Sequence, residues 1–456
     1  MRGQLTGRLG LILGMGGAMA ALPMAASAQD ATVVIEAANS TAYIFNTLLF
    51  LIGGFLVMWM AAGFAMLEAG FVRTKNVSMQ CLKNIMLYSL AGIMFWIFGY
   101  DMLYAGLNDY INFGSLLQPG YPLEPVGLAG ADDAATAANQ AAALDTGYSV
   151  ASDWFFQMVF CATTASIVSG TVAERIKFWP FFIFVAFLTA FIYPVVAGWE
   201  WGGGFLDDMG FSDFAGSTLV HSTGGWAALV GAIIIGPRLG KYVGGKVNPI
   251  PASNIPLATL GMFILWLGWF GFNGASQLAA GTIGDVSDVS RIFVNTNMAA
   301  AGGVIAAIFY TQLRYKKIDV TLAINGALAG LVAITAEPLA PSIGLSVIIG
   351  AIGSILACLT VPLLDKLKID DVVGAIPVHL VAGIFGTLAV AISFPELLVA
   401  QIVGVVATGV FVCAVSAVIW FVLKLTMGLR PSVEDETIGL DQAEIGVVAY
   451  PEFSAT

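Results

Sequence analysis

Histidine occurs only twice in this chain of 456 residues, at His221 and His379, and each lies within a long apolar stretch. Imidazole is the side chain whose charge changes near neutral pH, so a histidine can offer hydrogen bonds and carry a proton. An ionisable side chain in apolar surroundings is costly and marks a functional site by default. The two histidines are therefore the first candidates for chemistry.

Both histidines occur in the same local frame, D-x2-G-x4-H-x3-G. The first copy consists of Asp213, Gly216, His221 and Gly225, and the second of Asp371, Gly374, His379 and Gly383. Two copies of one frame predict equivalent positions in a duplicated unit, and hence a paired polar site. The alternative for each histidine is a hydrogen-bonded packing residue between helices.

Each frame begins with an aspartate, Asp213 or Asp371, eight residues before the histidine. A carboxylate at the start of a helix accepts hydrogen bonds from backbone N–H groups that lack partners within the helix. We therefore expect both aspartates to cap the helices that carry the histidines.

The composition places these frames in a membrane. Hydrophobic residues make up 58% of the chain and charged residues 10%, against about 25% charged residues in soluble domains. This predicts an all-α polytopic membrane protein. The net charge of −11 argues against nucleic acid as a partner, and the irregular spacing of the four cysteines indicates neither disulfides nor a metal site. No motif indicates a cofactor.

The N-terminus has the pattern of a secretory signal peptide. Arg2 and Arg8 precede an apolar run over 9–22 that is short for a membrane span, and small residues follow. The predicted parts are a signal peptide over 1–28, a membrane domain over 29–425 and a cytoplasmic tail over 426–456.

Eleven windows of about 20 mostly apolar residues predict eleven transmembrane helices. They start near Tyr43, Leu82, Val150, Phe178, Gly216, Asn254, Ile292, Thr321, Pro341, Gly374 and Leu397. Lys and Arg gather after the odd-numbered windows, and only Arg291 falls on the other side. Because basic residues accumulate in cytoplasmic loops, the N-terminus is predicted outside and the C-terminus inside.

His221 falls in the fifth window and His379 in the tenth. Five spans per repeat force the two halves to cross the membrane in opposite directions. We therefore predict two inverted five-helix repeats plus one extra helix. In many transporters of this architecture the site lies between the halves, near the bilayer midplane.

Two segments outside the windows are distinctive. Residues 105–148 contain no Lys or Arg and include an alanine-rich stretch over 130–144, which predicts an external, loosely structured insertion. Residues 432–456 carry six acidic side chains, which predict a tail that is either solvated or docks a soluble partner.

Seven short segments follow one another in an order typical of one membrane-protein family. They are 65–76 (AMLEAGFVRTKN), 173–176 (AERI), 201–204 (WGGG), 213–216 (DFAG) with His221, 268–273 (GWFGFN), 370–371 (DD) with His379, and 439–441 (GLD). With these segments the chain, from about Tyr43 through the tail, resembles the ammonium transporter family (Amt, related to Rh proteins). The resemblance implies a homotrimer in which each protomer has its own narrow pore for ammonium or ammonia.

The resemblance also implies roles for individual residues. It places an external recognition site at Phe160, Trp201 and Ser276, a gate of stacked rings at Phe160 and Phe272, and the twin histidines His221 and His379 below the gate. Asp213 matches a carboxylate that supports the recognition site. The positions that line or shape the route are Phe156, Gln157, Trp269 and Thr335.

Residue type alone leaves other roles open. Trp201 could belong to an interfacial aromatic belt, and Phe160 and Phe272 could be ordinary core or lipid-facing residues. Ser276 could bond its own helix backbone.

Charges at the ends of spans are also ambiguous. Glu68 and Glu174 are either ordinary loop charges or partners of Arg73 or Arg175.

Three departures from the family's pattern stand out. Residues 68–70 (EAG) stand where many bacterial members carry Tyr-Gly-Gly, and Gly374 stands where many carry a carboxylate. Residues 444–447 (EIGV) replace a common Glu-His-Gly-Glu, which bears on whether the tail couples the pore to the nitrogen-regulatory PII protein.

These inferences favour a non-enzymatic function, the transport of ammonium or ammonia across the inner (cytoplasmic) membrane of a bacterium. NH4+ would bind the external aromatic site, lose its proton and cross as NH3 past the twin histidines. An ammonium sensor of the same fold and an Rh-like neutral gas channel remain as alternatives. An intramembrane hydrolase is disfavoured, because the chain contains neither G-x-S-x-G nor H-E-x-x-H.

Overall fold

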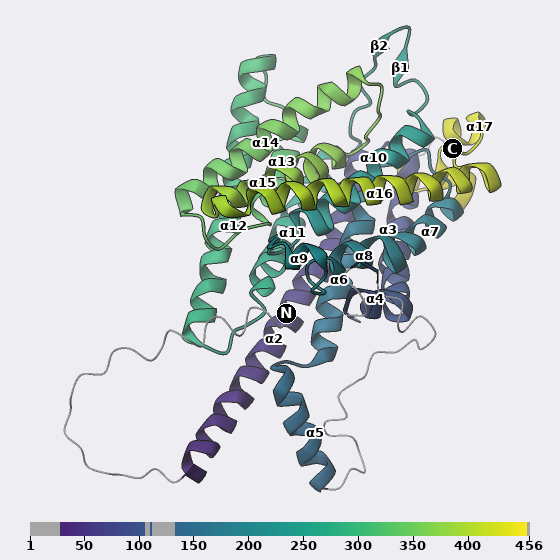
Figure 1. Ribbon diagram of the computed structural model, residues 1–456. Coiled ribbons are helices and arrows are strands. Elements are labelled where there is room, and N and C mark those ends of the chain that lie inside the picture. Colours follow the sequence, from purple (N-terminus) through teal and green to yellow (C-terminus); the bar gives the residue numbers. More distant parts are fainter. Residues whose placement is uncertain (1–27, 105–109, 112–132, 454–456) are drawn as a thin grey trace.

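The computed structural model describes residues 28–104, 110–111 and 133–453, which are almost entirely helical (Figure 1). The predicted signal peptide lies outside these residues except for Ala28, where the first described helix begins. The helices are α2 (Ala28–Phe71), α3 (Val77–Met94), α4 (Tyr100–Tyr104), α5 (Asp133–Thr146), α6 (Val150–Thr171), α7 (Phe178–Phe187), α8 (Tyr193–Gly198), α9 (Phe205–Asp208), α10 (Thr223–Ile235), α11 (Ile255–Gly274), α12 (Ile283–Tyr315), α13 (Val320–Ile334), α14 (Ile343–Lys366), α15 (Ala382–Ser393), α16 (Leu398–Thr426) and α17 (Val433–Ile438).

Several shorter elements join or extend these helices. Wider, π-helical segments are Phe95–Gly99, Leu188–Ile192, Ser217–Ser222, Ile376–Val381 and Asp441–Ile445, and 3-10 turns are Thr74–Asn76, Ala275–Gln277, Pro395–Leu397 and Pro451–Phe453. Two short strands, β1 (Tyr242–Val243) and β2 (Lys246–Val247), form an antiparallel hairpin.

Each of the eleven predicted windows is helical. Within the described ranges, nine helical segments are long and apolar enough to cross a membrane. The two other windows hold α6, with 22 residues, and α13, an apolar helix of 15 residues. The prediction of an all-α polytopic membrane protein is therefore confirmed, while the count of eleven spans and the orientation of the termini remain predictions.

Corresponding helices of the two predicted halves lie against each other. The first helix of each half, α2 or α11, packs along the other, and the two segments that carry the histidines are in contact. Small residues allow the first contact: a Cβ at Gly70 would lie 2.5 Å from the backbone nitrogen of Ala258, and one at Gly261 would lie 2.3 Å from that of Leu67. Such contacts between corresponding helices are expected if the two halves are related by a two-fold axis.

Two elements lie outside this pairing. The long helix α16 runs across α10 and α15 (Figure 1). The side chains on its far side are exposed and apolar, as expected of an added helix facing lipid. Helix α5 projects beside the start of α2 (Figure 1). The prediction of loose structure was therefore wrong for residues 133–146, because alanine has the highest helix propensity of all residues; residues 105–109 and 112–132 lie outside the described ranges.

Part of the acidic tail packs on the chain itself. The Asp441 carboxylate accepts hydrogen bonds from the backbone N–H groups of Ser78 and Met79, at the start of α3. The Glu444 carboxylate accepts one from the backbone of Phe178, at the start of α7. The tail therefore caps two helices of the membrane domain, an arrangement that the sequence did not predict.

A charge cluster lies on this tail side of the molecule. Arg238 pairs with Asp370 at 2.8 Å and with Glu174 at 3.0 Å, and Glu174 also pairs with Arg73. The predicted alternative of a Glu174–Arg73 pair is thus confirmed. Burial alone would raise the pKa of Asp370, but hydrogen bonds from Arg238 and the charges of Arg175 and Arg238 hold this pKa well below its usual range.

The depressed pKa of Asp370 gives a pH-dependent stability. Its contribution is fully present above the unfolded-state pKa of about 3.9 and is lost as pH falls towards the lower folded-state pKa. We expect D370N to lower the Tm in detergent near neutral pH and the difference from wild type to shrink below about pH 4. E434Q, at an exposed tail position, serves as the control; a D370N deficit that stays constant down to low pH would contradict the assignment.

Candidate functional site

The two histidines are in direct contact. Their Nδ1 atoms lie 3.1 Å apart, and the rings lie 5.2 Å apart at 23° to each other. His221 is fully buried and His379 is 4% exposed. At this distance one Nδ1 donates and the other accepts, so the pair has a defined arrangement of tautomers. The expected paired polar site is therefore present in the geometry.

The repeated frame produces the same local structure twice. Gly216 and Gly374 both have positive φ values, 103° and 80°, which favour glycine. Each glycine precedes a π-helical segment that contains the histidine and continues into α10 or α15. Such widened turns are rare in proteins overall but are frequent at functional sites. The repeated frame therefore determines the orientation of each imidazole ring.

Both aspartates cap these segments, as expected. The Asp213 carboxylate accepts hydrogen bonds from four backbone N–H groups at 2.7–3.2 Å, those of residues 216–219. Asp371 accepts from the backbone of Gly374 and Ile376 and from the Thr171 hydroxyl. The carboxylates thereby satisfy donors that would otherwise be unpaired in an apolar interior.

The last glycine of each frame lets the two segments cross closely. A Cβ at Gly225 would lie 2.7 Å from the Cβ of Leu380, the neighbour of His379. A Cβ at Gly383 would lie 2.5 Å from the carbonyl oxygen of Ser217. Each half therefore supplies a glycine against the other half's histidine segment, and this holds the imidazoles together.

A closed stack of aromatic rings adjoins His221. The rings of Phe160 and Phe272 are stacked with centroids 3.9 Å apart, and Phe272 in turn lies 5.2 Å from the ring of His221. Both phenylalanines are buried. Rings at stacking distance leave no opening between them, so passage of any molecule requires at least one ring to move.

Trp201 lies at the far end of this stack. Its ring meets Phe160 edge to face at 6.0 Å, and its indole N–H donates to the backbone oxygen of Asp213. Trp201 is half-buried, which leaves part of an aromatic face accessible beside the closed rings. This position differs from that of a lipid-facing belt residue, because the contacts are with the stack and with the Asp213 loop.

Two further predicted residues brace the histidines. Trp269 is stacked on His221 with centroids 5.1 Å apart, and its indole N–H donates to the Thr335 hydroxyl at 2.9 Å. The backbone oxygen of Thr335 accepts from the amide of Ala215, within the first histidine frame. Phe156 extends the stack outward, with its ring 4.7 Å from that of Phe160.

Ser276 and Gln157 are less directly connected to the stack. The Ser276 hydroxyl donates to the backbone oxygen of Phe272 one turn earlier, which is the local role left open from residue type; its oxygen lone pairs can still accept a donor. Gln157 is buried and its side chain interacts with Asp153 rather than with the rings.

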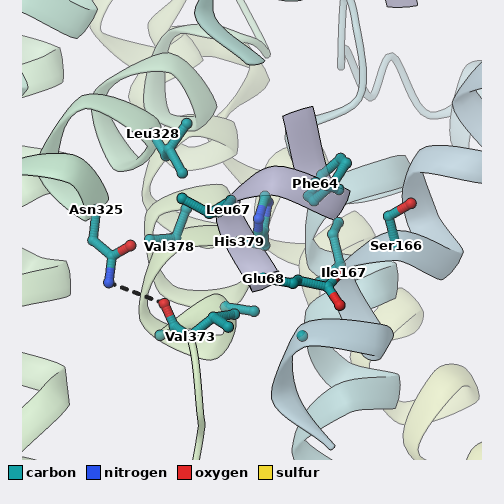
Figure 2. Close-up of a pocket in the computed structure, with 13 residues that line it drawn as sticks. Phe64, Leu67, Glu68, Ser166, Ile167, Asn325, Leu328, Val373, Val378 and His379 are labelled. Carbon is teal, nitrogen blue, oxygen red and sulfur yellow. Dashed lines mark hydrogen bonds between the residues drawn. The ribbon is translucent and has the colours of Figure 1, made fainter. Parts of the chain in front are cut away.

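A pocket opens on the other side of the histidine pair. The pocket is small, with a cavity volume of about 10 Å³, and its wall includes His379, Phe64, Glu68, Ser166 and Asn325 (Figure 2). Phe64 lies against the His379 ring, with centroids 6.2 Å apart. The row of rings and histidines therefore ends at a small, mainly apolar cavity whose wall includes four polar side chains, those of His379, Glu68, Ser166 and Asn325.

No separate sequence signal indicated Phe64, and Glu68 was predicted to be either a loop charge or a partner of an arginine. Glu68 is instead 1% exposed, and within the described residues it pairs with neither Arg73 nor Arg175. The spacing of residues 64 and 68 could have indicated that they act together, because they are one helical turn apart and therefore share a face of α2.

The geometry combines a half-buried tryptophan, a closed stack of phenylalanine rings, two imidazoles in contact and a small pocket with a carboxylate in its wall. Among the described residues no group of three or more His, Cys, Asp or Glu side chains could hold a metal ion. The arrangement suits a small polar solute that can lose and regain a proton, since imidazoles can hydrogen-bond it and carry the proton.

Comparison with known proteins agrees with this class of site. Residues 48–450 match the model of the Ammonium Transporter Family. The chain therefore belongs to the ammonium transporter family, a family of multi-pass membrane proteins.

Two relatives show the extent of the match. Ammonium transporter Amt2 of Archaeoglobus fulgidus is 39% identical, over 89% of this chain and 88% of the relative. A putative ammonium transporter of Synechocystis is 38% identical, over 94% of each chain.

Solved structures show the same fold. A structure described as a sensor Amt protein superposes with a TM-score of 0.78 and 36% identity, over 88% of this chain and 98% of that one. Mep2 of Candida albicans, at 24% identity, shares the fold with a TM-score of 0.75, over 91% of this chain and 92% of that one.

The capping role of Asp213 predicts that replacing its carboxylate by an amide lowers the stability of the protein. In D213N an amide N–H group would face backbone donors, leaving buried groups unpaired at a cost of about 1–3 kcal/mol. We expect a lower Tm in detergent than for D208N, which alters an exposed carboxylate at the end of α9, five residues earlier. Equal Tm values for the two variants would show that the four hydrogen bonds contribute little.

Proposed function

We propose that the chain conducts ammonium across the inner (cytoplasmic) membrane of a bacterium, recruiting NH4+ outside, passing NH3 through the aromatic gate and returning the proton inside. The observation that carries the proposal is the contact between His221 and His379 directly below the closed Phe160–Phe272 stack. Family membership supplies the substrate class.

Electrostatics explains why a proton would be removed. Moving a bare small cation into a low-dielectric interior costs tens of kcal/mol in the ideal limit. A membrane potential supplies only about 2.3 kcal/mol per charge per 100 mV. Neutral NH3 avoids most of this cost, whereas K+ has no proton to leave behind and would be excluded.

The external end supplies attraction for the cation. The faces of Trp201 and Phe160 would each contribute a cation–π interaction, and the Ser276 hydroxyl oxygen would accept a hydrogen bond from NH4+. Asp213 supports this site by holding the loop to which the Trp201 indole is bonded. The ion then loses its proton, and one phenyl ring moves aside for NH3.

The histidines would handle both NH3 and the proton. Each imidazole can donate to or accept from NH3, and a shift of tautomers across the 3.1 Å contact would carry a proton between the halves. Trp269, Thr335 and Phe156 keep the rings in place, and Gln157 shapes the outer part of the route.

Membership of the ammonium transporter family supports a proposal for the assembly. We propose a homotrimer of eleven-span protomers surrounded by lipid, with a pore in each, the N-terminus outside and the C-terminus inside. The tail side would face the cytoplasm, where the nitrogen-regulatory PII protein is the candidate partner.

Two alternative functions can each be distinguished from transport by a different measurement. The similarity to a sensor Amt protein favours ammonium sensing as the second candidate, and rescue of growth on limiting ammonium would separate transport from sensing. An Rh-like gas channel would move NH3 without current, so an ammonium-dependent current on solid-supported membranes distinguishes it from the proposed mechanism.

The histidine pair can be tested directly. Replacing both His221 and His379 by leucine should abolish the ammonium-dependent current or remove the discrimination between NH4+ and K+, because the relay is lost. The measurement is the current from proteoliposomes given either ion. Unchanged current and selectivity in the double variant would count against the relay.

The aromatic site can be tested through affinity. W201L should weaken the apparent affinity for ammonium about 2- to 30-fold, as loss of a contact worth roughly 0.5–2 kcal/mol implies. W59L, at an exposed position on α2, is the matched control. If both variants keep wild-type affinity in concentration-dependent uptake, Trp201 does not bind the cation.

A further inference from the structure

Glu68 is a buried carboxylate on the tail side of the histidine pair. It lies near the end of α2 and lines the same pocket as His379 (Figure 2). Phe64, one turn earlier on α2, lies against the His379 ring. A solute that passes the histidines and enters this pocket therefore meets the Glu68 side chain.

Only one oxygen of this carboxylate is satisfied. Its Oε2 accepts hydrogen bonds from the Gln80 amide at 2.6 Å and from the Ser169 hydroxyl at 2.8 Å. Its Oε1 has no hydrogen-bond partner among the described residues. A buried acceptor without a partner is costly, and here it belongs to a side chain that is fixed in place by its other oxygen.

A buried lysine balances the charge without occupying the free oxygen. Lys83 is fully buried; its ammonium group donates to the backbone oxygen of Ser169 at 2.9 Å and lies 4.7 Å from the ring centre of Phe181. Lys83 and Glu68 interact electrostatically, but they form no ion pair within 4.0 Å in the described structure. Glu68 can therefore gain or lose a proton while its neighbours stay in place.

We propose that Glu68 is the proton donor and ammonium-binding group at the inner end of the pore, an inference that rests on the proposed transport function. NH3 that passes His379 takes the proton of the Glu68 carboxylic acid: the O–H bond breaks, an N–H bond forms, and the product NH4+ is held by the carboxylate. NH4+ leaves towards the tail side. The proton released at the outer site passes across the His221–His379 contact and restores the carboxylic acid, so the components of one NH4+ cross per cycle.

The local chemistry suits this step. NH4+ can donate four hydrogen bonds, and Glu68, whose Oε1 has no partner among the described residues, lies in the pocket wall as a charged acceptor. The hydroxyl of Ser166, in the same wall, donates to its own helix and keeps lone pairs free. A purely structural Glu68 would need only the Gln80 and Ser169 hydrogen bonds, which a glutamine at position 68 could largely keep.

The test compares variants in proteoliposomes and first establishes transport by the wild type. Absence of ammonium uptake and current in the wild type would refute the proposed function itself, and the inference with it. With wild-type transport established, E68Q should reduce the ammonium-dependent current at least tenfold and abolish its dependence on the pH of the tail-side solution. E68D should restore part of both.

S169A separates the carboxylate from its hydrogen bonding. It removes one hydrogen bond to Glu68 but keeps the carboxylate, so the dependence of the current on the pH of the tail-side solution should persist in S169A. A wild-type current and pH profile in E68Q would overturn the inference and leave transport intact. Equal losses of current and Tm in E68Q and S169A would also overturn it, by showing that the cluster is structural.

A second measurement does not depend on the folding of E68Q. Infrared difference spectra of the wild-type protein on ammonium addition should show a carboxylic acid losing its proton, and the same signal should be shifted in E68D. If ammonium produces no carboxylic acid change in the wild type, Glu68 is not the donor.

Discussion

The close contact of His221 with His379 is the interaction on which the rest of the site depends. Two imidazoles can be buried at 3.1 Å only if their helices cross tightly and their backbones lose no hydrogen bonds. Gly225 and Gly383 allow the crossing, and Asp213 and Asp371 satisfy the backbone donors at the start of each segment. The whole repeated frame therefore serves the placement of two rings.

The ion pairs of the membrane domain described here lie away from the apolar surroundings of the histidine pair. The rings of Phe160 and Phe272 are stacked with no opening between them. The Arg238–Asp370 pair and the docked tail lie outside this ring stack. In the proposed mechanism, a route with this apolar centre would select solutes by their ability to lose a proton rather than by ion size.

Local patterns predicted much of this arrangement, and non-local packing determined the rest. The frame around each histidine and the eleven apolar windows depend on neighbours in sequence, so the helices and caps could be predicted. The burial of Glu68 depends on Gln80 in α3 and Ser169 in α6, and no local signal indicates such contacts. Helix α5 differs from the prediction because an alanine-rich stretch, which is typical of low-complexity segments, also has a high helix propensity.

The position of Glu68 follows from the same close packing that joins the two halves. Gly70 has no room for a side chain against the backbone of Ala258, so the end of α2 is held at a fixed rotation against α11. That rotation places Phe64 against His379 and Glu68 in the pocket wall. Gly70 and Lys83 therefore support the glutamate at position 68 in different ways. Gly70 allows the helix rotation that directs the Glu68 side chain, and the buried Lys83 lowers the free-energy cost of the Glu68 charge.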